Sequence, residues 1–375
     1  MPNNPLILVS SEIQSYYGRG IMEGICDYAN DHGPWELLHV GPFSKSRNLN
    51  ALKREHDGVI GPIPELFGKV KPTVNIMDRQ IDDLPRVYVN DRQVAELADQ
   101  HFAGNGWQHV SYLGPVHSTR WKRLKQISQY RNAHVIKPIA WEMFHAKPWH
   151  QRHQMLRKWL KQMRYPTAIL AYTDNLGAEV LEAAFALKKN VPDDVAVMGV
   201  NDDRLVCEFV SPRLSSIALA VHRVGYEAAA LLDRMLKGEP IDQAPILINP
   251  MGLVPRQSTE HMAVEDRRVR DAMQFIQNHI DQPITLKEVA SHVAMSPRSL
   301  QRSFRDVLGR SPSEEIRRVR LEKAKRLLIE TQLSLSQIAE ETGYLYTTHL
   351  SKQIKEYLGC APIAFRKRFQ SDRYF

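Results

Sequence analysis

The C-terminal third of this chain contains one helical pattern twice, and this duplication restricts the fold more than any other feature. Residues 286–308 predict two short amphipathic helices joined by a tight turn, and residues 335–358 repeat the pattern. The tetrapeptide Gly309-Arg-Ser-Pro312 follows the first copy and recurs 50 positions later as Gly359-Cys-Ala-Pro362. Residues 311–331 predict one long amphipathic helix between the copies. The sequence therefore predicts an all-α domain in which a long helix connects two equivalent units.

The second helix of the first copy has one apolar face and one basic face. Ser296 and Pro297 are typical of a helix start, because serine caps the first turn and proline lacks only an amide hydrogen that would be unpaired there. The apolar positions are Leu300, Phe304 and Val307, and the opposite face carries Arg298, Arg302 and Arg305. This pattern is typical of a helix-turn-helix whose second helix reads DNA, since a guanidinium can bind guanine or phosphate through two hydrogen bonds.

A basic face on one helix is equally compatible with an ordinary solvated surface. The second copy favours DNA binding, because two such units on a stiff helix suit successive major grooves about 34 Å apart. The candidate DNA-binding residues are Arg298, Ser299, Arg302 and Arg305 in the first copy, and Thr348, His349, Lys352 and Lys355 in the second. The second set is less basic, so we expect it to contribute more to phosphate anchoring than to base discrimination.

Three motifs in this part of the chain also resemble a known family. They are IRRVRLEKAKRLL at residues 316–328, IAEETGY at residues 338–344 and GCAPIAFR at residues 359–366. With them, residues from about 268 to 370 resemble the DNA-binding domain of the AraC/XylS family of transcription regulators. The second copy departs from the family at His349 and Ile354, where aromatic residues are common. The resemblance implies sequence-specific binding to double-stranded DNA.

The distribution of charge and cysteine agrees with DNA binding in a reducing compartment. Residues 262–375 hold 20 Lys and Arg against 14 Asp and Glu, whereas residues 1–261 hold 30 against 28, so most of the net charge of +8 lies in the last third. The three cysteines are far apart and form no CxxC motif. No signal peptide and no run of 18 apolar residues is found. We expect a cytoplasmic protein without a membrane span.

The first 258 residues alternate short buried-type strands with amphipathic helices, which is typical of a parallel sheet covered on both faces. Clear strands are predicted at residues 6–10, 109–114, 168–172 and 195–200. The predicted organisation is an α/β two-lobed sensor at residues 1–258, a polar linker at 259–266 and the all-α domain with two helix-turn-helix units at 267–375. Within the sensor we expect lobe 1 at about 1–115 plus 245–258 and lobe 2 at about 116–244. Two such lobes predict a hinged protein with a ligand at the strand ends.

The sensor part also resembles a known family in four segments. They are YGRGIMEGI at residues 17–25, AILAYTD at 168–174, VPDDVAVMGVNDD at 191–203 and SPRLSSI at 211–217. These segments resemble the LacI/GalR-type, periplasmic-binding-protein-like sensor domain, and their combination with an AraC-type reader is similar to the regulators of xylose operons. The resemblance implies a monosaccharide effector such as xylose.

The candidate effector-binding residues are polar and aromatic side chains near strand ends, because sugars are held by planar polar groups and a flat aromatic ring. They are Tyr17, Arg19, Asn90, Asp91, Trp121, Lys125, Asp174, Asn201 and Asp202. Sugar-binding relatives commonly carry Asp at the positions of Asn90 and Asn201 and Arg at that of Lys125, which favours a sugar as a class over xylose itself. Alternatively, strand-end Asp and Asn residues are only helix caps and turn formers.

Nothing in the sequence indicates catalysis. No GxSxG, HExxH, Walker or GxGxxG motif is present, and His150 and His153 lack a third metal ligand nearby. We expect a regulator without cofactor or metal, acting as a homodimer on operator DNA, with RNA polymerase as a further partner. The alternatives are a sugar-modifying or DNA-repair enzyme with a DNA-binding tail, a solute-capture protein, and an architectural DNA binder without effector.

Overall fold

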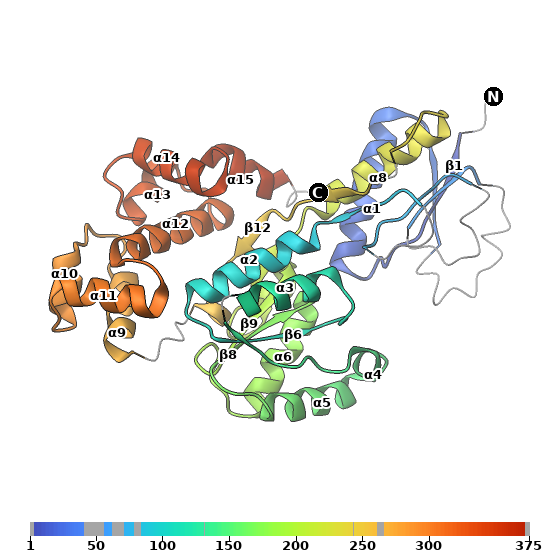
Figure 1. The fold of residues 1–375 in the computed structure, drawn as a ribbon. Coiled ribbons are helices and arrows are strands. Elements are labelled where there is room, and N and C mark those ends of the chain that lie inside the picture. The colour runs from blue at the N-terminus through green and yellow to red at the C-terminus, as the bar shows by residue number, and fades with distance from the viewer. Residues whose placement is uncertain are drawn as a thin grey trace.

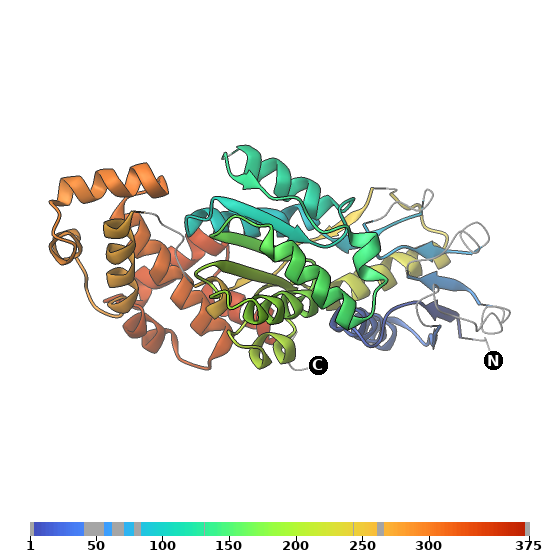
Figure 2. The ribbon, with the colours of Figure 1, turned by 90° about the horizontal axis from the view of Figure 1, so that it is seen from below.

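The computed structural model describes residues 4–40, 56–61, 71–78, 84–130, 132–242, 244–260 and 266–371. Two α/β lobes are followed by a helical domain, and Figures 1 and 2 both place the helical domain beside the second lobe, at the end of the molecule opposite the first. The α/β fold followed by an all-α domain is as the sequence predicts. No helix in the described ranges is both long and apolar enough to cross a membrane.

The first lobe is built on a four-stranded parallel sheet of order β2-β1-β3-β4. Its strands are β1 (Leu6–Val9), β2 (Glu36–His39), β3 (Gly58–Ile60) and β4 (Thr73–Val74), and β5 (Val87–Val89) pairs separately with β11 (Ile246–Ile248). Helices α1 (Tyr16–His32) and α8 (Val221–Leu236) pack against each other here. Glycine allows this close approach: a Cβ at Gly24 would lie 1.9 Å from the carbonyl oxygen of His222, and one at Gly225 would lie 2.0 Å from that of Ile21.

The second lobe is built on a six-stranded sheet of order β12-β10-β9-β8-β6-β7. The strands are β6 (His109–Leu113), β7 (His134–Val135), β8 (Thr167–Ala171), β9 (Val195–Asn201), β10 (Ser215–Ala218) and β12 (Gly252–Val254), with β12 antiparallel to β10. Its helices are α2 (Asp91–Gly104), α3 (Thr119–Tyr130), α4 (Trp141–His145), α5 (Trp149–Lys161), α6 (Asp174–Ala186) and α7 (Arg204–Phe209). Alternate residues of β8 face two separate cores, so α2 and α3 cover one face of the sheet and α5 and α6 the other.

The predicted lobe boundaries are wrong at four elements, namely α2, β6, α8 and β12. Residues 91–113 are predicted in the first lobe, but α2 packs on α3, and β6 pairs with β7 and β8 in the second. Residues 221–236 were assigned to the second lobe, but α8 packs on α1 and β3. Of the returning strands, β11 joins the first lobe while β12 joins the second sheet. The sequence of a strand or helix indicates which of its side chains are buried, but not which sheet it packs against or enters. This explains why the lobe boundaries were predicted wrongly.

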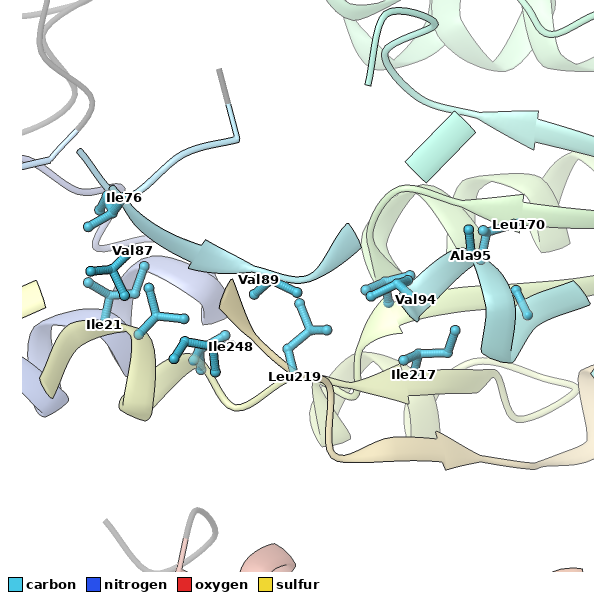
Figure 3. Close-up of a cluster of buried hydrophobic side chains, with 14 of the residues drawn as sticks. Ile21, Ile76, Val87, Val89, Val94, Ala95, Leu170, Ile217, Leu219 and Ile248 are labelled. Atoms are coloured by element: carbon cyan, nitrogen blue, oxygen red, sulfur yellow. The ribbon is translucent and has the colours of Figure 1, made fainter. Parts of the chain in front are cut away.

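One apolar core runs from the first lobe into the second. Figure 3 shows Ile21, Val87 and Ile248 in the first lobe and Val94 and Ile217 in the second, with Val89 and Leu219 between them. The core is therefore packed around the crossings between the lobes that Val89 and Leu219 mark.

The helical domain contains two units on a long helix, as the sequence predicts. Its helices are α9 (Arg267–Asn278), α10 (Leu286–His292), α11 (Pro297–Leu308), α12 (Pro312–Glu330), α13 (Leu335–Glu341), α14 (Thr347–Leu358) and α15 (Pro362–Ser371). Capping boxes at Thr285, Ser311 and Ser334 start three of them. Gly309 and Gly359 end α11 and α14 with φ angles of 68° and 73°, which explains the repeated glycine. Of the predicted linker, Thr259 is buried in the short 3-10 helix η2 (Gln257–Thr259), and residues 261–265 lie outside the described residues.

Candidate functional site

The first candidate surface is the outer face of α11. Ser296 caps the helix by accepting a hydrogen bond from the amide of Ser299 at 3.1 Å, and Pro297 occupies the first turn, as predicted. Leu300 and Phe304 are fully buried, which turns the opposite side outward. That outward side carries four exposed candidates, namely Arg298, Ser299, Arg302 and Arg305. The helix therefore presents a basic ridge to solvent.

Arg302 has an acidic neighbour, but the pairing is weak. Its Nε lies 3.7 Å from Oδ2 of Asp306, and the two side chains are 85% and 67% exposed. Exposed pairs of this kind contribute only about 0–1 kcal/mol. Arg302 can therefore exchange this partner for a phosphate or a guanine edge at little cost.

The second candidate surface is the outer face of α14. Leu350 and Ile354 are buried, and the exposed side carries Thr348, His349, Lys352 and Lys355. The His349 ring stands edge-on to the Tyr344 ring, with 5.4 Å between centroids. The two repeats thus present comparable ridges, and the second ridge is less positively charged.

Sequence reasoning missed two features beside α14. Leu345 and Tyr346 are 82% and 69% exposed in the turn that precedes the helix, although apolar side chains are unusual at an exposed turn. A groove of about 200 Å³ also lies between α12 and α14, and Arg317, Arg320, His349 and Gln353 contribute to its lining. Arg317 and Arg320 alternate with the apolar residues Ile316, Val319 and Leu321, so their spacing alone did not separate them from a solvated helix face.

In the sensor, the structure brings Asp91 together with a residue that sequence reasoning missed. Arg120, in the first turn of α3, donates two hydrogen bonds to Oδ1 of Asp91 at 3.1 and 2.6 Å. It donates a third to the carbonyl oxygen of Tyr172 at 2.8 Å, and its guanidinium lies 4.6 Å from the centre of the Tyr172 ring. The Arg120 and Asp91 side chains are only 5% and 9% exposed. The signal for Arg120 was its place at a strand-to-helix loop, next to the predicted Trp121.

Tyr17 belongs to the same neighbourhood, although it comes from the first lobe. Burial raises the pKa of the Tyr17 hydroxyl, nearby Tyr172 and Asp91 raise it further, and Arg120 opposes them. We call Tyr17, Asp91, Arg120 and Tyr172 the Arg120 cluster. It combines a carboxylate, a guanidinium and two phenol rings from both lobes, which is the chemistry that a sugar needs.

The other predicted effector residues lie in varied surroundings. Asn90 caps α2 and donates a hydrogen bond to Asn249 at 2.9 Å, which links two of the segments that cross between lobes. Trp121 is buried and stacks on Tyr112, with 5.5 Å between ring centroids. Lys125 is exposed, and Arg19 is exposed and donates to the carbonyl oxygen of Gln14 at 3.1 Å.

Asp174 and Asp202 are engaged in a buried network of the second lobe. Asp174 accepts hydrogen bonds from the amide of Asp203 at 2.7 Å and from the hydroxyl of Ser216 at 2.5 Å. Asp202 lies 2.8 Å from Nη2 of Arg256, whose side chain is 3% exposed. Asn201 and Asp202 both have positive φ, at 121° and 59°. In this structure these carboxylates hold the end of β9 in place.

The burial of Asp174 predicts a pH dependence of stability. Burial raises its pKa to about 8, against the hydrogen bonds from Ser216 and Asp203, whereas aspartate in an unfolded chain titrates near about 3.9. Between these values the folded protein holds a proton that the unfolded chain lacks, so the free energy of unfolding should fall as pH rises, by up to about 1.4 kcal/mol per pH unit. Urea unfolding of the wild type and of Asp174→Asn across this range should show the wild type losing stability relative to the variant as pH rises, because the other titrating groups, His101 among them, are common to both proteins. Parallel curves would contradict the raised pKa.

No group of three or more His, Cys, Asp or Glu side chains is placed to hold a metal ion in the parts of the chain that the structure describes.

The helical domain and the sensor each match a family model. Residues 100–259 match a periplasmic binding protein-like domain, and residues 289–368 match a helix-turn-helix domain. The chain is 30% identical to the xylose operon regulatory protein of Escherichia coli strain K12, over 93% of this chain and 94% of that protein. It is 25% identical to the protein of the same name from Haemophilus influenzae, over 93% and 95%.

A solved structure described as the xylose-binding transcription activator XylR has the same fold. It matches with a TM-score of 0.59 at 23% identity, covering 98% of both chains. The relatives found are transcription regulators rather than enzymes, and the similarity extends across both domains. The chain therefore belongs to the family of xylose operon regulatory proteins, transcription regulators that join a periplasmic-binding-protein-like domain to an AraC-type helix-turn-helix domain.

Proposed function

We propose that this regulator controls a sugar-utilisation operon by inserting α11 and α14 into operator DNA when a monosaccharide binds at the Arg120 cluster. The observation that carries the DNA-binding half is the pair of ridges, in which Leu300, Phe304, Leu350 and Ile354 are buried while the basic and polar positions between them are exposed. Arg302 is the central arginine of the more basic ridge.

The effector half of the proposal rests on the chemistry of the Arg120 cluster. Asp91 and Arg120 offer an acceptor and a fork of donors side by side, and Tyr17 and Tyr172 offer aromatic surface. Asn90 follows β5 of the first lobe, and Asn201 ends β9 of the second, where Asp174 and Asp202 hold the strand end through Asp203 and Arg256. D-xylose is the first sugar to test, because the relatives are named as regulators of xylose operons.

The remaining parts of the proposal concern assembly. We propose that residues 1–258 bind the effector, that residues 259–266 link the two domains, and that residues 267–375 bind DNA. Two copies would place four reading helices on a pair of half-sites, as regulators of this kind commonly do. RNA polymerase is the further partner of an activator, and all these encounters belong to the cytoplasm.

The test compares Arg302→Ala with a matched control, Arg267→Ala. Arg267 is exposed and lies 3.7 Å from Asp271, the same distance as in the Arg302–Asp306 pair, but it stands on α9. Binding to a duplex that the protein itself selects from a random pool should weaken by about 1–3 kcal/mol in Arg302→Ala and little in Arg267→Ala. D-xylose should change the wild-type affinity.

Two other results would revise this proposal. An equal loss on selected and random duplexes would make Arg302 a phosphate contact rather than a base contact. An unchanged affinity of Arg302→Ala for both would remove α11 from the DNA interface.

A further inference from the structure

The sensor and the DNA-binding domain meet where α12 crosses the C-terminal end of α2. Arg310 donates a hydrogen bond to the carbonyl oxygen of Gly104, and Arg318 donates one to Oδ1 of Asn105 at 3.2 Å. Both guanidinium groups also donate hydrogen bonds to the Glu315 carboxylate, and the bond from Arg318 is 2.7 Å long. We call these five residues the α2–α12 joint. Two cations therefore sit at the end of a helix whose unpaired carbonyl groups favour positive charge.

The charges in this joint are buried rather than solvated. The Glu315 side chain is fully buried, and those of Arg310 and Arg318 are 16% and 21% exposed. Burial alone would raise the pKa of Glu315, but Arg318 and Arg310 outweigh it and hold that pKa below its usual value. The carboxylate thus stays ionised and fixes both arginines in one geometry. Such a triad resists sliding, because any displacement leaves a buried charge unpaired.

An apolar seam continues the joint along α12. Leu321, Ala324 and Leu328 of α12 share one buried cluster with Ala218 of β10 and Val254 of β12. Beside the seam, His101 of α2 bonds to Thr259 at 2.9 Å, and burial lowers the pKa of His101 to about 4, so the imidazole is neutral near pH 7. All of these sensor elements belong to the second lobe, and Figure 1 places the first lobe far from α12.

The opposite end of α2 lies in the proposed effector site. Asp91 stands in its first turn and binds Arg120, and Asn90 caps it and binds Asn249 of the neighbouring connection. The helix has 14 residues, so the two ends are about 20 Å apart. Its buried side carries Val94, Ala98 and Phe102 along most of that length, which favours movement as one rigid body.

We propose that α2 is the lever that couples the effector site to the reading helices. This inference rests on the proposed function, since it names how that same site is regulated. A sugar that engages Asp91 and Arg120 changes how the N-terminal end of α2 is held. The C-terminal end then carries Arg310 and Arg318 with it, and α12 reorients both helix-turn-helix units relative to the second lobe. The sugar can shift this arrangement only by the difference in its affinity for the two states.

The test measures coupling in Asn105→Ala and Arg318→Ala, with Lys323→Ala as the control. Lys323 stands on the same helix but pairs with Glu341 of α13, inside the DNA-binding domain. D-xylose affinity is measured with and without the selected duplex, and duplex affinity with and without D-xylose. In the wild type and in Lys323→Ala, the duplex should change D-xylose affinity by the same factor as D-xylose changes duplex affinity. That factor should lie within the usual range of about 5–150-fold. In the two joint variants both factors should fall to about one, while D-xylose affinity without DNA is retained.

Hydrogen exchange tests the joint without any sugar. Adding the selected duplex should slow exchange of the backbone amides of residues 98–105 in the wild type and in Lys323→Ala, but not in Asn105→Ala. Unchanged exchange in the wild type, or full coupling in both joint variants, would overturn the proposal. If the wild type binds no sugar, the proposed effector is wrong. The hydrogen-exchange result then still tests whether the α2–α12 joint connects DNA binding to α2. Asn105→Ala keeps the arginine–glutamate triad, so it answers the question if Arg318→Ala does not fold.

Discussion

Arg120→Ala is expected to lower the free energy of unfolding by about 3–5 kcal/mol and to remove the response to D-xylose. The substitution leaves the Asp91 carboxylate, which is 9% exposed, without the guanidinium that binds it at 2.6 Å. It also frees the carbonyl oxygen of Tyr172. A buried charge that loses its partner is costly, whereas an exposed pair is not.

Urea unfolding and thermal shift with D-xylose check this result, and Arg152→Ala is the control. Arg152 pairs with Glu179 in the same lobe, but its side chain is 25% exposed and it lies outside the Arg120 cluster. The control should lose less stability and keep its thermal shift. Arg120→Lys keeps the charge without the fork of donors, so it should recover part of the stability and little of the sugar response. A stable, sugar-responsive Arg120→Ala would show that the cluster neither supports the sensor nor binds the effector.

Phe304→Ala is expected to unfold the first helix-turn-helix unit while the sensor remains folded. Phe304 is fully buried in the cluster that joins α9, α10 and α11, together with Met273, Val289 and Leu300. Truncating a buried phenylalanine costs about 3–5 kcal/mol, which is a large fraction of the stability of a small helical unit. Without that core, Arg298, Arg302 and Arg305 lose their common face, and specific DNA binding should be lost.

Calorimetry and duplex binding measure this effect. The wild type should keep specific binding, and Phe304→Leu, which retains most of the buried volume, should keep most of it. Phe304→Ala should melt in two separated transitions, with the sensor transition still shifted by D-xylose. A single transition at a much lower temperature would mean that the two domains unfold together.

The sequence predicted the helical domain accurately because its signals are local. The alternation of Leu300 and Phe304 with Arg298 and Arg302, the serine at 296 and the glycine at 309 all act within about one or two turns of a helix. The structure confirms the cap at Ser296, the left-handed C-cap at Gly309 and their repetition at the second unit's Gly359. Strand identity in the sensor was also readable, since runs such as residues 168–171 are buried on both faces.

Prediction was weaker wherever side chains meet from distant parts of the chain. The sequence pointed to Trp121 and Lys125, but α3 turns Arg120 and Leu124 inward with Trp121, and leaves Lys125 exposed. Asp174 and Asp202 stand at strand ends as predicted, yet packing directs them toward Ser216 and Arg256. Whether these carboxylates or the Arg120 cluster contact the effector remains a prediction for the variants above.

By itself, the sequence determined that this protein has a two-unit helical reader behind an α/β sensor, because helix periodicity, capping and strand burial are set by residues close together in the chain. Only the tertiary structure decided which sheet receives β6 and β12, that Asp91 binds Arg120, and that Arg310 and Arg318 grip the end of α2. Those contacts join residues tens to hundreds of positions apart. Their formation depends on how whole elements pack and which charges they bury together, and no local pattern encodes that outcome.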